Sequence, residues 1–445
     1  MLFCVGLLAV PGVAEESGRS LSPAKLRRVA TVDERYQSYD LEIADGAQAQ
    51  PPVDLSSAPL RKLAAALGPA YVRVGATPKG WQGVADFARA VDAKIVASFA
   101  VGARDAAGGS APGPADKFAG LQPIARQIAA AELFDEPPAS GGAAGSDAAA
   151  FARDVAAFRR SARQTAPQLL VAGPGAEEGA SAVPALHGEA LLDAEPKPVF
   201  DVFTYRYHGA VPPKCSHGDQ ALLTSADQAM SEERLSRIDK VHALQESLRD
   251  RFAPGKPIWV TETADAACGG NPWASSFLDT FRYLDQLARL AKRGVKVQVH
   301  DSLAAGESGY LDAKTLAPRP KYWAAVLWRR LMGTAVLDAG PSRPGLHLYA
   351  HCLRGHRGGV VLLAINNTRN QPESIELPIG AERYTLSARR LQEGRVDLNG
   401  LRLAPQANGE LPQMRAIPTL PGTVVFVPAS ITFVAIANAK NAACR

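Results

Sequence analysis

Four acidic residues stand at the ends of apolar, strand-like runs, where their carboxylates could do chemistry. Asp33 follows VATV, Asp135 and Glu136 end AELFDE, and Glu262 lies in IWVTETADAACGG. Two carboxylates that converge across a cleft suit glycoside hydrolysis, because one protonates the leaving oxygen while the other attacks the sugar or orders a water molecule. Each acid alone is better explained as a capping or solvated loop residue. Their joint placement at strand ends favours the catalytic interpretation.

The strands that carry these acids alternate with amphipathic helices between residues 28 and 330. We expect eight strands, with the sequences VATVDERY, AYVRVGA, AKIVASFAV, AAELFDE, QLLVAGPG, FDVFTYRYH, PIWVTET and VKVQVHD. Strands that alternate with helices imply right-handed crossovers and a parallel sheet. Eight such units predict an α/β fold of the (β/α)8 TIM barrel type, with the active site at the C-terminal ends of the strands. No GxGxxG follows the first strand, which disfavours a dinucleotide-binding sheet.

The pattern changes after residue 335. Short alternating runs such as LHLYAHCLR and GVVLLAINNT are separated by glycine, proline and asparagine. This pattern predicts a C-terminal antiparallel β-sandwich over residues 335–445. A strand from residues 15–27 is expected to join it, which leaves 28–330 as the catalytic barrel.

The N-terminus and the composition bear on where the protein acts. MLFCVGLLAVPGVAEE resembles a signal peptide over residues 1–14, with Gly12-Val13-Ala14 before the cleavage point, although the charged n-region is missing. A buried N-terminal strand is the alternative. No later run of 18 apolar residues suggests a membrane span. We therefore expect a secreted or periplasmic monomer.

The charged residues exclude some classes of partner. The chain has 445 residues, of which 47% are hydrophobic and 21% charged, with a formal net charge of +5. This is a soluble globular composition, and no Lys/Arg run marks a nucleic-acid-binding tail. A mild basic excess is compatible with an anionic ligand.

The cysteines predict disulfides rather than a metal site. Removal of the leader would leave Cys215, Cys268, Cys352 and Cys444. Four cysteines in an exported chain allow two disulfides with three possible connectivities, and none has the close spacing of a zinc site. We expect no metal and no organic cofactor.

Six motifs resemble glycoside hydrolase family 79, the heparanases and β-glucuronidases, and they occur in the order of that family over nearly the whole chain. They are PAYVRVGATPK, AELFDEP, IWVTETADAACGG, GESGYLD, HLYAHC with VVLLAINNT, and DLNGLRL with IANAKNAAC. The resemblance implies a retaining glycosidase in which Glu136 is the acid/base and Glu262 the nucleophile. The two carboxyl groups are then expected about 5–5.5 Å apart.

The resemblance also implies which residues bind the substrate. They are Asp33, Thr77, Asp135, Gly269, Gly270, Gly306 and Tyr310. Tyr207, His208 and His300 are expected to line the floor of the same site, although each alone is better explained by ordinary packing or as a satisfied polar side chain. Backbone N–H groups of Gly269 and Gly270 would bind a uronate carboxylate, since glycine permits close approach. Gly306 and Tyr310 would complete that grip, although the tyrosine is shifted relative to the family pattern.

Two departures from the family pattern affect the expected activity. The family has asparagine where this chain has Asp135, and a carboxylate accepts but cannot donate a hydrogen bond. Mammalian heparanases carry a long excised linker after the third strand, whereas the segment here, GARDAAGGSAPGPADKF, is short. We expect a single active polypeptide with an open cleft, where basic residues such as Lys79 and Arg206 would attract a polyanion.

The family pattern pairs Cys352 with Cys444. Cys215 and Cys268 follow strands six and seven, which are neighbours in the barrel, so they are a second candidate pair.

The sequence as a whole predicts a retaining endo-β-glucuronidase that hydrolyses heparan sulfate or a related glycosaminoglycan. An exo-β-glucuronidase that releases terminal glucuronic acid is the nearest alternative. A catalytically silent carbohydrate-binding protein is an alternative of another class, with Asp135 as its sign. A serine esterase is disfavoured because no GxSxG follows a strand.

Overall fold

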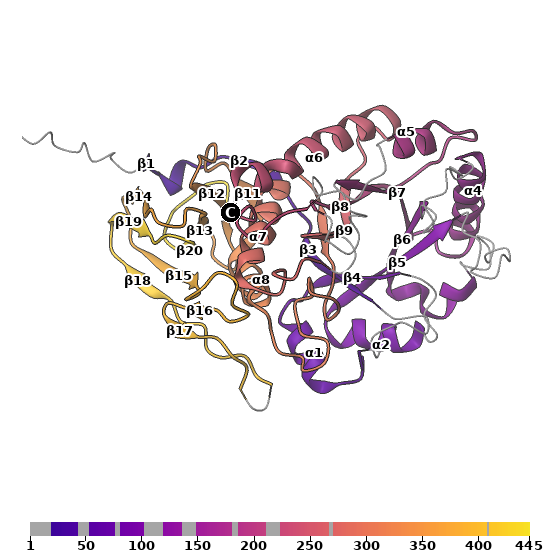
Figure 1. Ribbon diagram of the computed structural model, residues 1–445. Helices are drawn as coiled ribbons and strands as arrows, with labels where there is room; N and C mark the ends of the chain where they lie inside the picture. Colours follow the sequence, from indigo (N-terminus) through magenta and orange to yellow (C-terminus); the bar gives the residue numbers. More distant parts are fainter. Residues whose placement is uncertain are drawn as a thin grey trace, which may run out of the picture.

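A computed structural model describes residues 19–42, 53–75, 81–101, 119–135, 148–179, 186–210, 223–266, 270–406 and 409–445. Eight parallel strands close into a barrel in the order β10-β3-β4-β5-β6-β7-β8-β9 (Figure 1). They are β3 (Gln37–Leu41), β4 (Ala70–Gly75), β5 (Ala93–Val101), β6 (Ile128–Asp135), β7 (Leu170–Gly179), β8 (Val202–His208), β9 (Ile258–Ala264) and β10 (Val297–His300). The predicted barrel is confirmed, and seven of the eight expected strands coincide with these.

The first expected barrel strand is wrong. Residues Arg28–Thr31 form β2, which pairs antiparallel with β11 (Met332–Leu337) in the C-terminal domain. The first barrel strand is instead β3, which pairs with β10 and β4. Asp33 lies before β3, and its N–H donates to the carbonyl of Lys296, just before β10. Asp33 therefore lies at the N-terminal end of the barrel, opposite the face where a catalytic residue belongs.

Side chains of the barrel strands alternate between the interior and the helix layer. The lower interior is filled by one apolar cluster, made of Tyr71, Val96, Ala130, Ala172, Val202, Trp259, Val297 and Val299. Residues two or four positions further along the same strands therefore face the interior near the C-terminal mouth. This alternation decides which polar residues can meet there.

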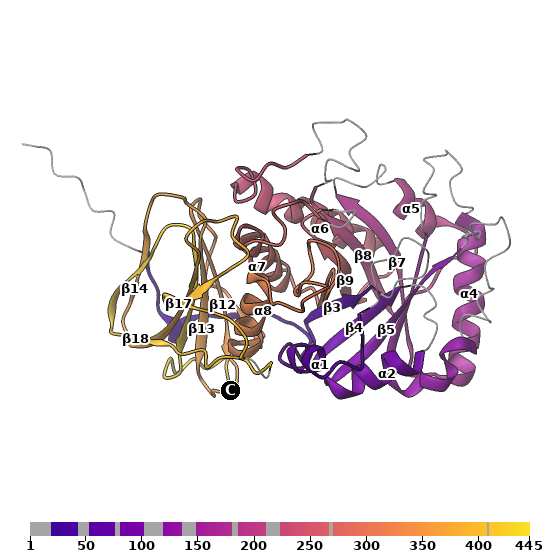
Figure 2. The ribbon, with the colours of Figure 1, turned by 60° about the horizontal axis from the view of Figure 1, so that its bottom comes forward.

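Helices surround the barrel (Figure 2). They are α1 (Ala58–Ala65), α2 (Trp81–Ala90), α4 (Ala148–Thr165), α5 (Leu186–Asp193), α6 (Glu232–Phe252), α7 (Phe277–Lys292) and α8 (Pro320–Leu331), with short 3₁₀ turns η1 (Pro23–Lys25) and η2 (Gln122–Gln127). Nearly all of α7 and α8 is buried, because these helices lie between the barrel and the β domain. In the part of the chain described, no helix combines the length and apolar character needed to cross a bilayer.

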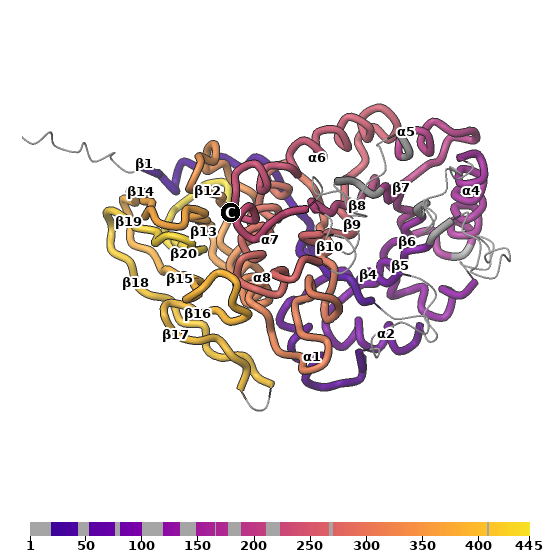
Figure 3. The backbone as a smooth tube through the Cα atoms, viewed as in Figure 1, coloured from indigo at the N-terminus to yellow at the C-terminus, as the bar shows by residue number. Residues whose placement is uncertain are grey.

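The C-terminal β domain is built from two sheets. The larger sheet has the order β17-β16-β15-β20-β13-β12-β11-β2, with β18 paired to β15. Its further strands are β12 (Leu346–Leu353), β13 (Val360–Asn366), β15 (Ala381–Ser387), β16 (Asp397–Leu398), β17 (Leu401–Arg402), β18 (Ile417–Thr419) and β20 (Ser430–Ile436). The smaller sheet joins β14 (Glu373–Leu377), β19 (Gly422–Phe426) and the N-terminal β1 (Arg19–Ser20), which runs parallel beside β14 (Figure 3). One apolar cluster contains residues of both sheets.

A disulfide closes the end of the β domain. Cys352 of β12 is bonded to Cys444, 92 residues later, with the two Cα atoms 5.3 Å apart. The pairing predicted for these cysteines is confirmed. On the chain-entropy view, closing a loop of this length stabilises the fold by about 4–5 kcal/mol.

A buried ionic network joins the barrel helices to the β domain. His347 of β12 lies between Asp285 of α7, 2.6 Å from its Nδ1, and Glu232 of α6, 2.9 Å from its Nε2. Arg289 also pairs with Asp285, at 2.6 Å. Burial alone would lower the pKa of His347, but the two carboxylates outweigh it and raise that pKa to about 9. At neutral pH the charged imidazolium of His347 therefore links the barrel to the β domain through ion pairs with both carboxylates.

Alkaline pH should weaken this junction. The folded pKa of His347 is about 9 against an ordinary 6.5, so its stabilisation is complete below pH 6.5 and is lost as the pH rises through 9. The difference corresponds to roughly 3 kcal/mol. We expect chemical denaturation to show a fall in unfolding free energy between pH 7 and 10 that is larger in the wild type than in His347→Gln.

A second histidine of β12 provides the matched control. His351 is also buried, but its Nδ1 donates to a backbone carbonyl, that of Gly333 at 2.6 Å, and burial lowers its pKa to about 4. His351→Gln should keep the alkaline loss of the wild type. Equal pH profiles for the wild type and His347→Gln would contradict the assigned role of His347.

Candidate active site

One buried cation lies among three carboxylates at the C-terminal mouth of the barrel. Arg73 of β4 donates from Nε to Glu132 at 3.1 Å and places Nη1 at 2.8 Å from Glu262 Oε2. Nη1 also donates to Asp40, and Nη2 donates to Ser98 Oγ at 3.0 Å. Arg73 is only 4% exposed. Five strands, β3, β4, β5, β6 and β9, thus meet at one guanidinium.

An irregularity in the pairing of β8 with β9 aims Glu262 at this cation. The register shifts between Tyr205 and Arg206, so that Arg206 pairs with Glu262 and Thr261 is the extra residue. Thr261 donates to Glu132 in the interior while its neighbour Glu262 reaches Arg73. A bulge of this kind lets two consecutive side chains turn to the same face, which a regular strand does not allow.

The side chain of Glu262 is the most accessible of the three carboxylates, with 21% exposed against 6% for Asp40 and none for Glu132. Arg206 Nη1 and His208 Nε2 of β8 each lie 3.9 Å from a Glu262 oxygen. Glu262 is therefore a surface-accessible carboxylate flanked by cationic and imidazole groups.

The charges of the site are unequal. Burial raises the pKa of Asp40 to about 7, although Arg73 opposes this. Burial would also raise the pKa of Glu132, but Arg73 outweighs it and holds that pKa below its ordinary value. Burial and the nearby charge of Glu262 raise the pKa of Asp301 well above normal. Arg73 itself is held protonated by the three carboxylates, which outweigh its desolvation and raise its pKa.

His208, Glu262 and Asp301 are close enough together to be tested as metal ligands, since one polar atom of each lies within 4.8 Å of the others. Two guanidinium groups, those of Arg73 and Arg206, already face Glu262. A metal ion there would be repelled by both cations. The charge distribution suits a site with a catalytic carboxylate, or a site that binds an anion through its two guanidinium groups, better than a metal centre.

Of the substrate contacts predicted on β8 and β10, only one faces the candidate site. His208 lies beside Glu262, as described above. Tyr207, one residue earlier, belongs to the core cluster of the helix layer, on the outer side of the barrel. His300 of β10 also faces outward, because Val299 faces the interior, and its Nε2 lies 2.9 Å from the carbonyl of Ser308. Tyr207 and His300 do not line the floor of the site, which corrects that prediction.

Tyr310 is not positioned to contact a ligand either. Its ring is fully buried against His300, with the ring centroids 4.5 Å apart, and its hydroxyl is 2.8 Å from that of Tyr283. The predicted role of Tyr310 in binding a carboxylate is therefore wrong. The two glycines of these loops, Gly270 and Gly306, have positive φ angles of 92° and 55°.

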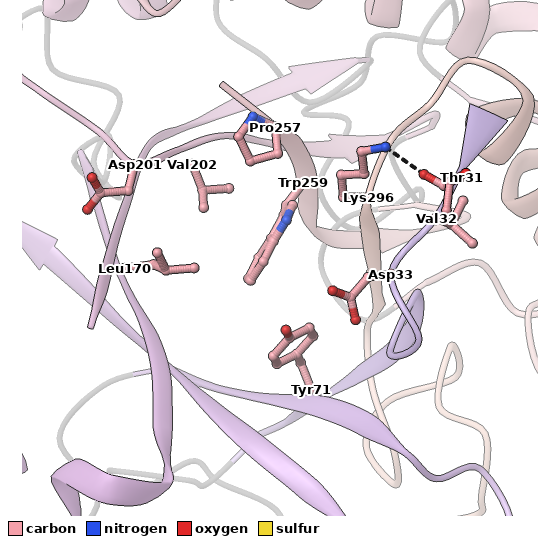
Figure 4. Close-up of a pocket in the computed structure, with 10 residues that line it drawn as sticks. All are labelled: Thr31, Val32, Asp33, Tyr71, Leu170, Asp201, Val202, Pro257, Trp259 and Lys296. Carbon is pink, nitrogen blue, oxygen red and sulfur yellow. Dashed lines mark hydrogen bonds between the residues drawn. The ribbon is translucent and has the colours of Figure 1, made fainter. Parts of the chain in front are cut away.

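Asp33 lines a pocket of about 400 Å³ at the opposite end of the barrel (Figure 4). Trp259 and Tyr71 close the barrel there, with ring centroids 5.0 Å apart, and Lys296 donates to the carbonyl of Thr31. Trp259 is only 4% exposed, so its ring is a plug of the barrel and offers little surface for a ligand. The predicted contact of Asp33 with substrate is wrong, because the pocket and Glu262 lie at different ends of β9.

Several predicted residues fall outside the described part of the chain: Glu136, Thr77, Gly269, Cys215 and Cys268. Asp135 is the last residue of β6, and its side chain is likewise not described. The acid/base assignment, the second disulfide and the distance between the two catalytic carboxylates therefore remain predictions.

The residues that sequence reasoning missed are Arg73, Asp40, Glu132 and Asp301. The first three are charged residues inside barrel strands and Asp301 directly follows one; in the run AYVRVG, Arg73 is the single charge. A lone charge inside a strand buried on both faces needs a partner, and this signal could have identified the group. It could not have indicated which strands contribute the partners.

The fold of the chain is similar to that of glycoside hydrolase barrels of known structure. A GH51 arabinofuranosidase from Xanthomonas axonopodis pv. citri superposes with a TM-score of 0.61 and 13% identity, covering 92% of this chain and 98% of that one. A 4-O-α-L-rhamnosyl-β-D-glucuronidase from Fusarium oxysporum superposes with a TM-score of 0.60 and 13% identity, covering 94% and 99%. At such low identity the likeness concerns the fold.

In sequence, the chain is similar to heparanases, which confirms the resemblance seen in its motifs. It is 28% identical over 297 residues to heparanase-like protein 1 of Arabidopsis thaliana, and 33% identical over 209 residues to the heparanase of Gallus gallus. These alignments cover 57% and 43% of this chain. A further relative is the human protein named inactive heparanase-2, at 31% identity over 235 residues. No family model matches the chain.

The chain spans about half the length, or less, of the curated relatives it matches. The alignments cover 53% of the Arabidopsis protein, 40% of the chicken heparanase and 39% of inactive heparanase-2.

Proposed function

We propose that this protein is a retaining glycosidase of the heparanase type, an endo-β-glucuronidase that cleaves internal glucuronic acid linkages in heparan sulfate or a related glycosaminoglycan. The observation that carries the proposal is Glu262, an accessible carboxylate at the C-terminal end of β9, held at 2.8 Å by the buried Arg73. The heparanase relatives and the glycoside hydrolase fold support a glycosidase.

Glu262 is the proposed nucleophile. Its carboxylate attacks the anomeric carbon and forms a glycosyl ester, while Glu136 donates a proton to the leaving oxygen and then deprotonates the water that releases the sugar. Arg73 contacts the Glu262 carboxylate at 2.8 Å and fixes the direction of its oxygen before the attack. As the ester forms, Glu262 loses its charge, and Arg73 remains paired with Asp40 and Glu132.

The charges beside Glu262 favour an anionic substrate. Arg206 is a second cation at the site, 3.9 Å from Glu262, and its Nε donates to the carbonyl of Gly175 at 3.0 Å. This backbone contact orients the guanidinium, which can then bind a uronate or a sulfate group. On this proposal the substrate is a polyanion, and the affinity of the protein for it falls as salt is added.

We also propose that the protein is exported. The Cys352–Cys444 disulfide is of the kind that persists in oxidising compartments. The apolar N-terminal stretch supports the same proposal.

The test is digestion of size-defined heparan sulfate, with chromatography of the products. The wild type should shorten the chains rapidly, because an endo enzyme cuts within the polymer, and Glu262→Gln should give no shortening. Release of single glucuronic acid with little change in chain length would replace the endo assignment with an exo-β-glucuronidase.

A silent carbohydrate-binding protein is the second candidate, because one relative is named inactive and Asp135 departs from the family pattern. This candidate predicts that the wild type and Glu262→Gln bind the polysaccharide equally and that neither yields products. Glu262→Gln differs from the wild type only in that an uncharged amide replaces the carboxylate. Any difference between their products therefore comes from the chemistry of Glu262.

A further inference from the structure

Two loops leave the barrel beside Glu262. The first begins at Asp265, three residues after Glu262, and continues into the segment that carries Gly270. The second begins at Asp301, whose carboxylate lies within 4.8 Å of that of Glu262, and carries Gly306 and Ser308. Both loops therefore leave the C-terminal mouth of the barrel next to Glu262, and their positions shape the site there.

Asp265 joins the two loops. Its Oδ1 accepts a hydrogen bond of 2.8 Å from Ser308 Oγ in the second loop. Its Oδ2 accepts from the side-chain amide of Asn271 at 2.9 Å and from the N–H of that residue at 3.2 Å. Asp265 is completely buried, so these bonds are shielded from water and its carboxylate is satisfied by neutral donors from both loops.

The loops approach so closely at this point that only glycine fits. A Cβ on Gly270 would lie 2.6 Å from Ser308 Oγ and 3.1 Å from Asp265 Oδ1. Gly270 also has a φ of 92°, which other residues rarely adopt. The contact between Asp265 and Ser308 therefore sets the packing distance of the loops directly.

Both ends of this connection are anchored in the helix layer. Arg234 of α6 donates to the carbonyl of Asp265. On the other side, Lys321 of α8 donates to the carbonyl of Ser308 at 3.0 Å and is itself paired with Asp279 of α7. The connection is thus held by side chains of the surrounding helices.

We propose that Asp265 is a positioning residue, which fixes the separation of the two loops and with it the binding of the sugar at Glu262. The inference rests on the proposed function, because the sugar is taken to be the glucuronate of that substrate. Asp265 does not touch the substrate. Its effect is on binding, since the loops form the walls of the site in both the ground state and the transition state.

The test is the steady-state kinetics of Asp265→Asn on heparan sulfate of defined length. An asparagine presents one acceptor and one donor. Its oxygen can still accept from Asn271, but its amide must then donate to Ser308 Oγ, so the serine hydroxyl has to turn and no longer donates across the loops. We expect KM to rise about tenfold while kcat falls less than about threefold, the pattern of lost uniform binding. Ser308→Ala removes only one of the bonds and should shift KM in the same direction by a smaller factor.

Asp201→Asn is the matched control. Asp201 is a partly buried aspartate at the other end of the barrel, bonded to Arg159 at 2.9 and 3.0 Å and to the N–H of Val171 at 3.0 Å. Its loss should lower the melting temperature without changing KM. Equal KM shifts in Asp201→Asn and Asp265→Asn, or unchanged KM in both Asp265→Asn and Ser308→Ala, would overturn the role of Asp265.

The experiment distinguishes failure of the positioning role of Asp265 from failure of the proposed function. A wild type that neither binds nor cleaves heparan sulfate overturns both proposals. A wild type that cleaves it, with variants of Asp265 and Ser308 that keep its KM, overturns only the positioning role.

Discussion

Replacing Glu262 with glycine should lower turnover of a β-glucuronide by a factor on the order of 10⁴ or more, and sodium azide should restore part of it. The loss is expected because no carboxylate remains to attack the anomeric carbon. The partial recovery is expected because the deleted side chain leaves space next to Arg73 and Arg206, which lie 2.8 and 3.9 Å from the Glu262 carboxylate. A small anion is attracted to that space.

The product distinguishes the mechanism. In the wild type, we expect two successive displacements to return the sugar in its original β configuration. In Glu262→Gly, an azide nitrogen attacks the anomeric carbon once while the leaving oxygen takes a proton from Glu136, so the product is the α-linked glycosyl azide. Proton NMR of the anomeric position separates the two configurations.

Glu262→Gln is the matched control for azide. Glutamine fills the same volume as glutamate, so no space opens beside Arg73, and we expect a comparable loss of turnover with no recovery. Recovery in both variants, or a β-linked azide from Glu262→Gly, would show that Glu262 is not the nucleophile. Near-normal turnover in Glu262→Gly would exclude it from the reaction altogether.

The barrel could be predicted from the sequence because seven of its strands are mainly apolar runs that alternate with helical segments, as expected for strands buried on both faces. The first strand was assigned wrongly because its residues, Gln37–Leu41, include three polar side chains that are nevertheless buried. The more apolar VATV was chosen instead, and it is an edge strand of the β domain. The misplacement of Asp33 follows from that single error.

The candidate site could be predicted in part. A sequence motif at the end of a strand locates Glu262, because a carboxylate at a strand end is a local feature of the chain. The partners of Glu262 come from β4 and β8, and nothing local to Arg73 indicates that it meets Glu262. Consecutive residues of a strand face opposite sides, so of Tyr207 and His208 only one can face the barrel interior and the other must face the helix layer. An error of one residue in the predicted strand exchanges the two.

Arg73→Met should both destabilise the fold and remove most of the activity. Met has a similar length but no charge, so Asp40, Glu132 and Glu262 would be left in a nearly dry interior without the cation that all three contact. Removing one partner of a buried ion pair typically costs about 3–5 kcal/mol. Loss of the contact that orients Glu262 should lower kcat by roughly 10²–10³-fold. Urea denaturation and steady-state kinetics measure the two effects.

The pH dependence of stability shows whether the loss in Arg73→Met comes from the buried carboxylates. In the wild type, Arg73 holds the pKa of Glu132 below its ordinary value, so Glu132 adds stability above that value and loses it in acid. Asp40 acts in the opposite direction, because its pKa is raised to about 7 and its ionisation weakens the fold as the pH rises through 7. Without Arg73, the effect of burial loses its main opponent, so the lowered pKa of Glu132 rises and the raised pKa of Asp40 rises further. Arg73→Met should therefore lose stability between pH 5 and 8 more steeply than the wild type.

Arg73→Lys separates charge from geometry. Lysine keeps a cation in the interior, so its stability should lie between those of the wild type and Arg73→Met, with a pH profile closer to the wild type. It has a single nitrogen, however, and cannot reach Glu132, Asp40 and Glu262 from the three directions that a guanidinium covers. We expect kcat to remain low in Arg73→Lys even where stability recovers. If activity recovered together with stability, charge alone would suffice, and the orientation of Glu262 by Arg73 would not contribute to catalysis.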